Sequence, residues 1–126
     1  MRQSIAPGLH ELEGAVMEQI WSAGECSVRE VMTALNRPSE TNRAYTTYMT
    51  IMARLEKKGL LMRSREGKTD HYRPRHSREE YIAMRARAEV EELVTQYGDI
   101  ALSHFARQVA GLDPARRRRL QRQARG

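Results

Sequence analysis

The segment from Arg43 to Gly59 constrains the fold most, because it carries two different faces at helical spacing. One face is apolar and consists of Tyr45, Tyr48, Met49, Met52 and Leu55. The other face combines hydroxyl and guanidinium side chains and consists of Arg43, Thr46, Thr47, Thr50 and Arg54. Glu56 is the only acid in the segment. We therefore expect an amphipathic helix whose apolar face meets a core and whose second face is free to bind a partner.

The threonines of the second face need an explanation, because threonine is a mediocre helix former. A helix laid in the major groove of DNA provides one. A threonine methyl can contact a thymine methyl, and its hydroxyl can reach a base edge or a phosphate. Arginine can grip guanine or phosphate in the same groove. The simpler alternative is a partly buried helix whose threonine face meets only solvent.

The distribution of charge favours an anionic partner. The chain of 126 residues has a net charge of +6 and a pI near 10.0. Residues 43–76 contain nine basic and three acidic residues, whereas residues 1–42 are net acidic. The basic surplus is therefore densest on the threonine-bearing helix and the segment after it. A chain of this length fits one domain, or one compact domain with an appended oligomerisation arm.

Two helices are expected before this segment. The first begins near Leu9 and ends at a capping Gly24. Its apolar face consists of Leu9, Leu12, Val16, Ile20 and Trp21. The acidic side chains lie off that face and are Glu11, Glu13 and Glu18. An acidic helix is a poor candidate for phosphate contact, so we interpret the first helix as scaffold, with Trp21 in the core.

The second helix is expected to be short. Residues 25–27 form a turn or a brief strand, and the capping-box pattern of Ser27 and Glu30 then starts about two helical turns. Pro38 is expected to end this helix, with residues 36–42 forming a loop. The expected order is therefore two helices followed by a third that carries the Thr/Arg face. This is the order of elements in a helix-turn-helix domain.

After Gly59 the pattern changes to a strand-like alternation. Residues 60–65 and 69–73 alternate on either side of a turn at residues 66–68, which predicts a β-hairpin with a three-residue loop. Its basic side chains are Arg63, Arg65, Lys68, His71 and Arg73. A basic hairpin directly after a major-groove helix would be the wing of a winged helix, with its tip over the phosphate backbone or the adjacent minor groove. The alternative is a hairpin that contacts only solvent.

The last third of the chain predicts three helices. They cover residues 78–97, residues 99–110 and the segment after Pro114. Their apolar faces exceed what one small chain can cover, so we expect them to pair with a second chain; the alternative is a monomer with the arm folded back. The side chains expected at the dimer interface are Leu93, Tyr97, Leu102, Phe105 and Val109. The run Arg116 to Arg119 is interpreted as a solvated face, with direct DNA contact as the alternative.

No enzyme, cofactor or metal site is expected. The four histidines lie in separate elements without the spacing of metal ligands, and they are His10, His71, His76 and His104. Cys26 is the single cysteine, so a small filler residue is favoured over an activated thiol, and no intramolecular disulfide can form. No apolar run approaches the ~20 residues that span a bilayer, and no signal-peptide pattern is present. We therefore expect a cytoplasmic protein.

Ten short motifs between Leu9 and Glu80 carry a family resemblance. They are Leu12-Glu13, Val16-Met17, Ile20-Trp21, Val28-Arg-Glu-Val31, Ala44-Tyr-Thr-Thr47, Met49-Thr50, Arg54-Leu55, Lys58-Gly-Leu60, Arg65-Glu-Gly67 and Tyr72-Arg-Pro74. In this order they resemble the BlaI/MecI/CopY (penicillinase repressor) family of bacterial repressors. The block from Ala44 to Thr50 is the most diagnostic part.

The resemblance implies an N-terminal winged helix and a C-terminal helical dimerisation arm, and homodimers that repress genes from palindromic operators. It implies base reading by Thr46, Thr47 and Thr50, with Arg43 and Arg54 at the ends of the helix. It implies wing contacts by Arg63, Arg65 and Lys68. Tyr48 replaces the small aliphatic residue usual in the family, so it needs extra room in the core or displaces the recognition helix outward.

Two switches are known in the family, and each depends on particular residues in the C-terminal arm. Copper-responsive members carry C-terminal Cys-x-Cys motifs, and no cysteine follows Cys26 here, which excludes copper sensing by that route. Members that respond to β-lactams are inactivated by proteolysis at an Asn-Phe bond in the arm. The aligned bond here resembles His104-Phe105, in which the asparagine is replaced. Cleavage at this bond by a regulatory protease is therefore a hypothesis.

These patterns together predict a mainly α protein with a small β-hairpin wing. The winged helix-turn-helix domain is expected at residues 9–76 and the helical dimerisation arm at residues 77–126. The expected partner is double-stranded DNA with an inverted-repeat operator, bound by a homodimer. Two alternatives are a ligand-sensing regulator of the MarR type and a winged helix that docks on an acidic protein. The first needs an effector pocket between arm and winged helix, which no polar cluster in the sequence suggests.

Overall fold

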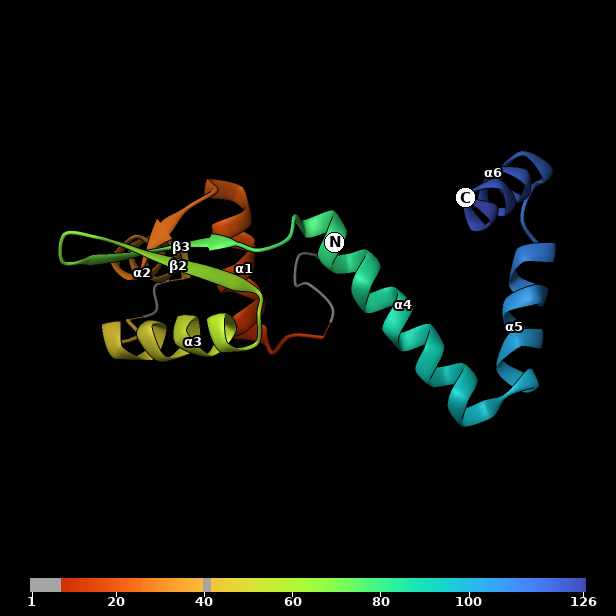
Figure 1. Cartoon of the computed structure of the whole chain (residues 1–126), viewed down its shortest axis with the longest axis horizontal. Helices are drawn as coiled ribbons and strands as arrows, with labels where there is room; N and C mark the ends of the chain where they lie inside the picture. The colour runs from red at the N-terminus through yellow and green to blue at the C-terminus, as the bar shows by residue number, and fades with distance from the viewer. Residues whose placement is uncertain (1–7, 40–41) are drawn as a thin grey trace. The chain divides into compact units, whose positions relative to one another are not determined.

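The computed structural model describes residues 8–39 and 42–126, and the chain divides into two compact units (Figure 1). The first unit extends to Arg85, and the second is Ala86–Gly126. The elements of the first unit are α1 (Glu11–Ala23), β1 (Cys26–Ser27), α2 (Val28–Ser39), α3 (Tyr45–Lys57), β2 (Leu61–Glu66), β3 (Thr69–Pro74) and the first part of α4 (Arg78–Tyr97). This order confirms the predicted winged helix-turn-helix. Among the described residues, no helix has the length and apolar character needed to cross a membrane.

The core of the first unit lies among the three helices and the base of the hairpin. Each element contributes aliphatic, sulfur or tyrosine side chains, as expected for a chain with one Phe and one Trp. The buried side chains are Val16, Met17 and Ile20 of α1, Cys26, Val28 and Val31 of β1 and α2, Tyr48, Ile51, Met52 and Leu55 of α3, and Leu61 and Tyr72 of the hairpin. This arrangement holds α3 against α1 and α2 by one face only.

The buried face of α3 differs from the predicted one at its edges. Tyr48 and Met52 are fully buried as predicted, but Tyr45 and Met49 are 41% and 44% exposed. Ile51, which lay outside the predicted face, is buried instead. The reason is that the apolar stripe is wider than the contact surface that α1 and α2 offer, so its flank toward the hairpin stays open.

Helix α2 is longer than the predicted two turns, because it continues through Pro38. Proline removes a single backbone donor in the last turn of the helix, and Asn36, just before it, contacts the start of α3. The Asn36 side chain donates to the Arg43 carbonyl at 3.0 Å and accepts from the Tyr48 hydroxyl at 2.7 Å. The larger Tyr48 is therefore accommodated inside the core with its hydroxyl satisfied. Residues 40–41 of the predicted loop lie outside the described residues.

The chain turns sharply from α3 into the hairpin at Gly59. This glycine has a φ of +85°, which side chains rarely adopt, and the Leu60 amide donates back to the Leu55 carbonyl at 3.0 Å. The hairpin therefore starts immediately after the helix and runs alongside it (Figure 1). Its position is set by backbone geometry rather than by a flexible linker.

The hairpin belongs to a three-stranded antiparallel sheet in the order β1-β3-β2. Cys26 pairs with Tyr72, which ties the base of the hairpin to the helical core. At the tip Glu66 pairs with Thr69, so the loop consists of Gly67 and Lys68 alone, and the predicted three-residue turn was one residue too long. Gly67 has a φ of +62°, the conformation that two-residue hairpin loops require.

The start of α4 is fixed to α1. The indole of Trp21 donates to the His76 carbonyl at 2.8 Å, and its ring lies 5.6 Å from that of Tyr81. Arg78 contacts both carboxylate oxygens of Glu18 at 2.9 Å. Trp21 is half-buried rather than fully enclosed, so it seals the edge of the core where α4 begins.

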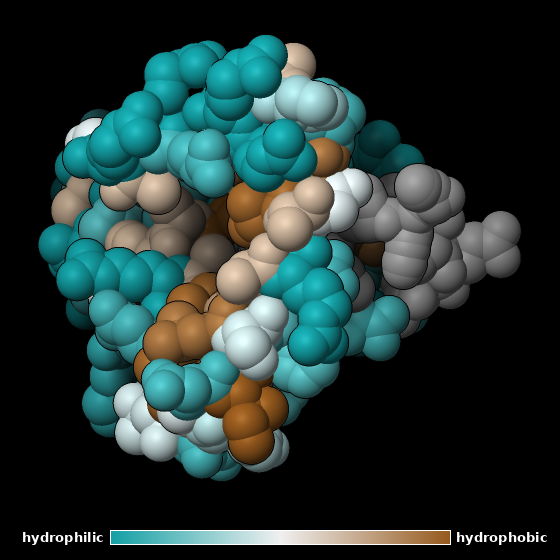
Figure 2. Space-filling model, turned by 90° about the vertical axis from the view of Figure 1, so that its right-hand side faces the viewer, coloured by the Kyte–Doolittle hydropathy of each residue, from teal (hydrophilic) through white to brown (hydrophobic). Residues whose placement is uncertain are grey.

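The second unit consists of helices and has no core of its own. It contains the rest of α4, α5 (Asp99–Ala110) and α6 (Pro114–Arg125). Every residue of Ala86–Gly126 is described and none of them is buried. Its exposed large apolar side chains are Val90, Leu93, Tyr97, Ile100, Leu102 and Phe105. In the space-filling view, apolar side chains gather in the middle of the visible face and hydrophilic ones border them (Figure 2).

Candidate nucleic-acid interface

The solvent face of α3 is the centre of the candidate site. Directly opposite the buried face runs a row at helical spacing i, i+4, i+7 and i+11 that consists of Thr46, Thr50, Ala53 and Lys57, all exposed. Thr47 and Arg54 lie beside this row, and both are exposed. Arg43 is also exposed and lies two residues before the helix. The structure therefore brings the predicted α3 residues together on one outward surface that carries no carboxylate.

Two members of this surface were missed in the sequence pattern. Ala53 and Lys57 continue the row of Thr46 and Thr50, and the signal was available in the spacing. The small side chain of Ala53 leaves the middle of the row flat. Lys57 adds a cation near the C-terminal end of the helix, where the helix dipole also favours positive charge.

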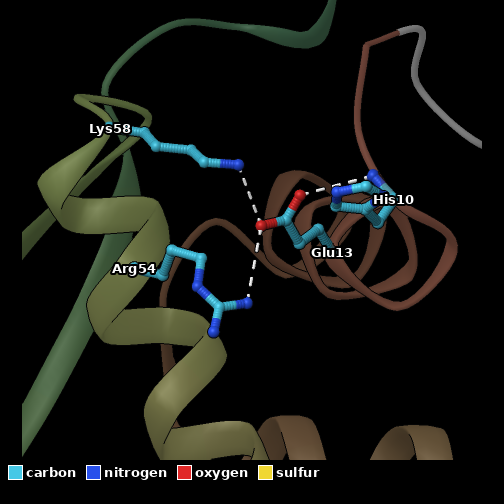
Figure 3. Close-up of polar contacts among 4 residues, drawn as sticks. All are labelled: His10, Glu13, Arg54 and Lys58. Atoms are coloured by element: carbon cyan, nitrogen blue, oxygen red, sulfur yellow. Dashed lines mark hydrogen bonds and ion pairs between the residues drawn. The ribbon is translucent and has the colours of Figure 1, made fainter.

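A buried carboxylate anchors the C-terminal end of α3 (Figure 3). Glu13 of α1 is 2% exposed, and its Oε2 accepts from Lys58 Nζ at 2.9 Å. Arg54 Nη1 lies 4.0 Å from the same oxygen, and the His10 amide donates to Oε1 at 3.3 Å. The expectation that Glu13 lies off the packed face was therefore wrong, because its charge is paired with cations from a distant helix.

Opposing effects act on the pKa of Glu13, and the favourable contacts of its carboxylate outweigh the cost of burial. Burial alone raises the pKa of its carboxyl, but the hydrogen bonds from Lys58 and from the His10 amide lower it. The attraction of the lysine charge adds to these effects, and the net result is a pKa below the ordinary value. Glu13 is therefore ionised at neutral pH and holds Lys58 and Arg54 beside the exposed face of α3.

A groove separates α3 from the tip of the hairpin, and we refer to it as the wing groove. It encloses about 500 Å³ and is lined by Ser27, Val28, Arg29, Tyr45, Met49, Arg65, Lys68, Thr69, Asp70 and Tyr72. Arg29, at the start of α2, lies 5.6 Å from the ring centre of Tyr45. Sequence reasoning did not include Arg29, because its neighbours in space come from two later segments of the chain.

The basic side chains of the hairpin differ in whether an acidic side chain lies close to them. Arg63 lies 3.7 Å from Glu56 and 3.8 Å from Asp70, and the pKa of its guanidinium is raised, first by Glu56 and then by Tyr72. Arg65 lies 3.9 Å from the same Asp70. Lys68, in the turn, has no hydrogen bond or ion pair to any described residue. The hairpin tip therefore presents one cation fully available to an anion.

Other chemistry is not assembled among the described residues. No group of three or more His, Cys, Asp or Glu side chains there is placed to hold a metal ion. Cys26 is buried, and burial raises the pKa of its thiol, with Glu30 and Glu25 raising it further. This environment opposes thiolate formation, so Cys26 is a packing residue.

Comparison with known proteins identifies related chains. The family described as "Penicillinase repressor" matches residues 9–125. The transcriptional regulator BlaI of Mycobacterium tuberculosis H37Rv is 39% identical over 111 residues, which cover 85% of this chain and 77% of the relative. The same values hold for BlaI of a second strain of this species.

Solved structures resemble the chain in fold. The complex structure of hsRosR-S4 aligns with a TM-score of 0.56 at 14% identity and covers 86% of this chain and 96% of that chain. The solution structure of the DNA-binding domain of the repressor BlaI aligns with a TM-score of 0.49 at 30% identity, covering 61% of this chain and 89% of that one.

Proposed function

The chain belongs to the penicillinase repressor family, and we propose that it represses transcription as a homodimer bound to inverted-repeat DNA operators. Membership of this family makes it a DNA-binding transcriptional repressor and not an enzyme. The observation that carries the finer proposal is the solvent face of α3, which joins hydroxyl and cationic groups without an acid. We propose a cytoplasmic location, because a DNA-binding repressor acts where it has access to its operators.

In this proposal, α3 reads the major groove and the hairpin grips the backbone. Thr46, Thr47 and Thr50 contact base edges, while Arg43 and Arg54 flank them. Arg63, Arg65 and Lys68 contact phosphates and release counterions, so affinity falls as salt rises.

The dimer is proposed to form through the arm, residues 77–126. Within the arm, no residue of Ala86–Gly126 is buried, and helices without buried side chains are marginal in water because packing supplies most helical stability. A second copy of the arm would cover the apolar side chains Leu93, Tyr97, Leu102, Phe105 and Val109. Two-fold symmetry then places two α3 helices on half-sites one or two DNA turns apart, at ~34 Å per turn.

Relief of repression by cleavage at His104-Phe105 stays a prediction drawn from the family. Both residues are exposed but lie inside α5, so a protease would need local opening of that helix. Detection of only the intact chain in induced cells would contradict this mechanism. The MarR-type and protein-docking alternatives are disfavoured by the family match.

The proposed function is tested by selection from genomic DNA. Purified protein is incubated with sheared DNA of its own genome and excess random competitor, and the retained fragments are sequenced. A few sites that share an inverted repeat would support a dimeric repressor and identify its operator. Retention without a shared motif would leave only electrostatic binding and contradict base reading by α3.

Replacing Thr47 or Thr50 by alanine is expected to reduce discrimination between operator and random DNA. Each good base contact contributes about 1–3 kcal/mol of discrimination, and Ala is a better helix former than Thr, so folding is retained. The measurement is the ratio of dissociation constants on the two DNAs. Thr33→Ala on α2 is the control, because Thr33 is exposed but lies outside α3. An equal loss on both DNAs would refute base reading.

Replacing Lys68 by alanine is expected to weaken binding to every sequence by a similar factor. Lys68 is unpaired at the hairpin tip, so it can neutralise one phosphate. The slope of log affinity against log salt should fall by about 0.9. Arg87→Ala in the arm, where Arg87 pairs with Glu91 at 3.1 Å, should leave the slope unchanged. A sequence-dependent loss would instead assign Lys68 to base contact.

A further inference from the structure

The last helix of the chain carries an unbalanced positive charge. Helix α6 contains six arginines and no acid, and Asp113 before it is used as the N-cap, accepting from the Arg116 amide at 3.0 Å. The sequence pattern favoured a solvated face for this run. The structure adds two observations. The arginines lie on two different sides of the helix, and those on the exposed side form no hydrogen bond or ion pair with a described residue.

The arginines of α6 fall on two sides. Arg117 is half-buried, and its Nη1 donates to the carbonyls of Ala110 at 3.3 Å and Leu112 at 3.0 Å, which fixes α6 to the end of α5. Leu120 lies on the same side and is also half-buried. The opposite side carries Arg118, Arg122 and Arg125 at i, i+4 and i+7, with Arg119 beside them, and all four are exposed. We refer to these four residues as the arginine stripe.

The arginine stripe has no internal partner. Within the described residues, no hydrogen bond or ion pair of a stripe side chain is found. Elsewhere in the same unit a cation is balanced in its own helix, as Arg87 is by Glu91 at 3.1 Å. Like charges three and four residues apart repel and destabilise a helix. An anionic partner would remove this repulsion.

We propose that the arginine stripe of α6 binds the phosphate backbone of double-stranded DNA, as a contact surface additional to α3 and the hairpin. This inference rests on the proposed function, because it assumes a protein that already works on DNA. Arg118 and Arg125 lie about 10 Å apart along the helix axis, a span of about three successive phosphates of one strand. Guanidinium groups also match phosphate oxygens in a two-pronged geometry.

The composition of α6 argues against an anionic membrane as the partner. A helix that lies on a lipid surface needs a broad apolar face opposite its cations. In α6 the only large apolar side chain is Leu120, and it is half-buried beside Arg117. A phosphate lattice needs no apolar contact, so DNA fits this helix better than lipid does.

The test neutralises the stripe in the full chain by the triple substitution Arg118→Gln, Arg122→Gln and Arg125→Gln. Glutamine retains length and helix propensity. The control, Arg87→Gln, Arg107→Gln and Arg116→Gln, changes the net charge equally but lies off the stripe. Dissociation constants for random duplex DNA are measured from low to moderate salt, with circular dichroism and sedimentation confirming folding and association state. We expect the stripe variant to lower the salt slope by about 2–3, and the control by less than 1.

The outcomes separate the stripe from the proposed function. Equal slopes for the stripe variant, the control and the wild type, together with selective binding of the operator by all three, would overturn the stripe alone. Failure of the wild type to bind any DNA would overturn both proposals. Loss of binding to phosphatidylserine vesicles in the stripe variant, with unchanged DNA binding, would assign the stripe to a membrane and contradict the proposal.

Discussion

Replacing Phe105 by aspartate is expected to yield a monomer whose operator affinity is reduced at least about a hundredfold. Phe105 is 37% exposed on a helix without buried residues, in a unit that has no core. In the proposed dimer its ring would be covered by the second copy, where a carboxylate would be buried without a partner. Joining two binding modules raises avidity by about 10²–10⁴, and this gain disappears when the dimer separates.

The control for this prediction uses the other side of the same helix. Ser103→Asp adds the same charge to α5 at a position away from Leu102, Phe105 and Val109, so it should leave the dimer intact. Sedimentation equilibrium measures the association state, and titration of whole-operator and half-site duplexes measures binding. The Phe105→Asp variant should retain its half-site affinity within a few-fold. A variant that stays dimeric would exclude α5 from the interface.

The sequence predicts which face of α3 is exposed, because that face is defined by helical spacing. A helix that buries one face must expose the opposite one, so Thr46 and Thr50 had to lie outward once Met52 and Leu55 were buried. Helical spacing alone could not predict which residues at the edges of the apolar face of α3 are buried. Tyr45 remains exposed because it lines the open wing groove between α3 and the hairpin tip. The sequence does not specify how far the hairpin lies from α3.

The missed features depend on partners that are distant in the sequence. Glu13 was expected to face solvent because acidic side chains on a helix are mostly exposed. Its partner Lys58 lies 45 residues later and is brought to it only by the packing of α1 against α3. The contacts of Asn36 are also distant in the sequence, because its partners Arg43 and Tyr48 lie 7 and 12 residues later.

The sequence also predicted that the arm needs a partner, on the basis of apolar area. No residue of Ala86–Gly126 is buried, which agrees with that argument, since helices of this length require packing to persist. The arm and the winged helix thus have different physical roles. The winged helix contains its own core and presents polar groups, whereas the arm presents apolar groups that a second copy would cover in the proposed dimer.

Replacing Lys58 by methionine is expected to lower the free energy of unfolding by about 2–3 kcal/mol at pH 7, because it leaves a buried carboxylate without its closest cation. Methionine retains the aliphatic stem, so packing changes little. Arg54, 4.0 Å from Glu13, compensates in part, which keeps the loss at or below the lower limit of the range of about 3–5 kcal/mol for broken buried pairs. Arg78→Met provides a matched control, because it breaks a partly exposed ion pair with Glu18, which lies on α1 like Glu13. This substitution should lower the free energy of unfolding by about 1 kcal/mol or less.

The pH dependence identifies Glu13 as the origin of this loss. The pKa of Glu13 in the folded protein lies below its ordinary value of 4.5, so its pairing contributes stability above that pH and loses it as the pH falls through the folded pKa. The difference between wild type and Lys58→Met should therefore shrink on acidification from about pH 6 to pH 3. Adding Glu13→Gln to Lys58→Met should recover most of the stability at pH 7, because no buried charge remains. Urea unfolding of the full chain at one protein concentration measures the wild type and the three variants. A loss in Lys58→Met that is independent of pH and persists in the double variant would mean that Lys58 stabilises α3 by packing alone.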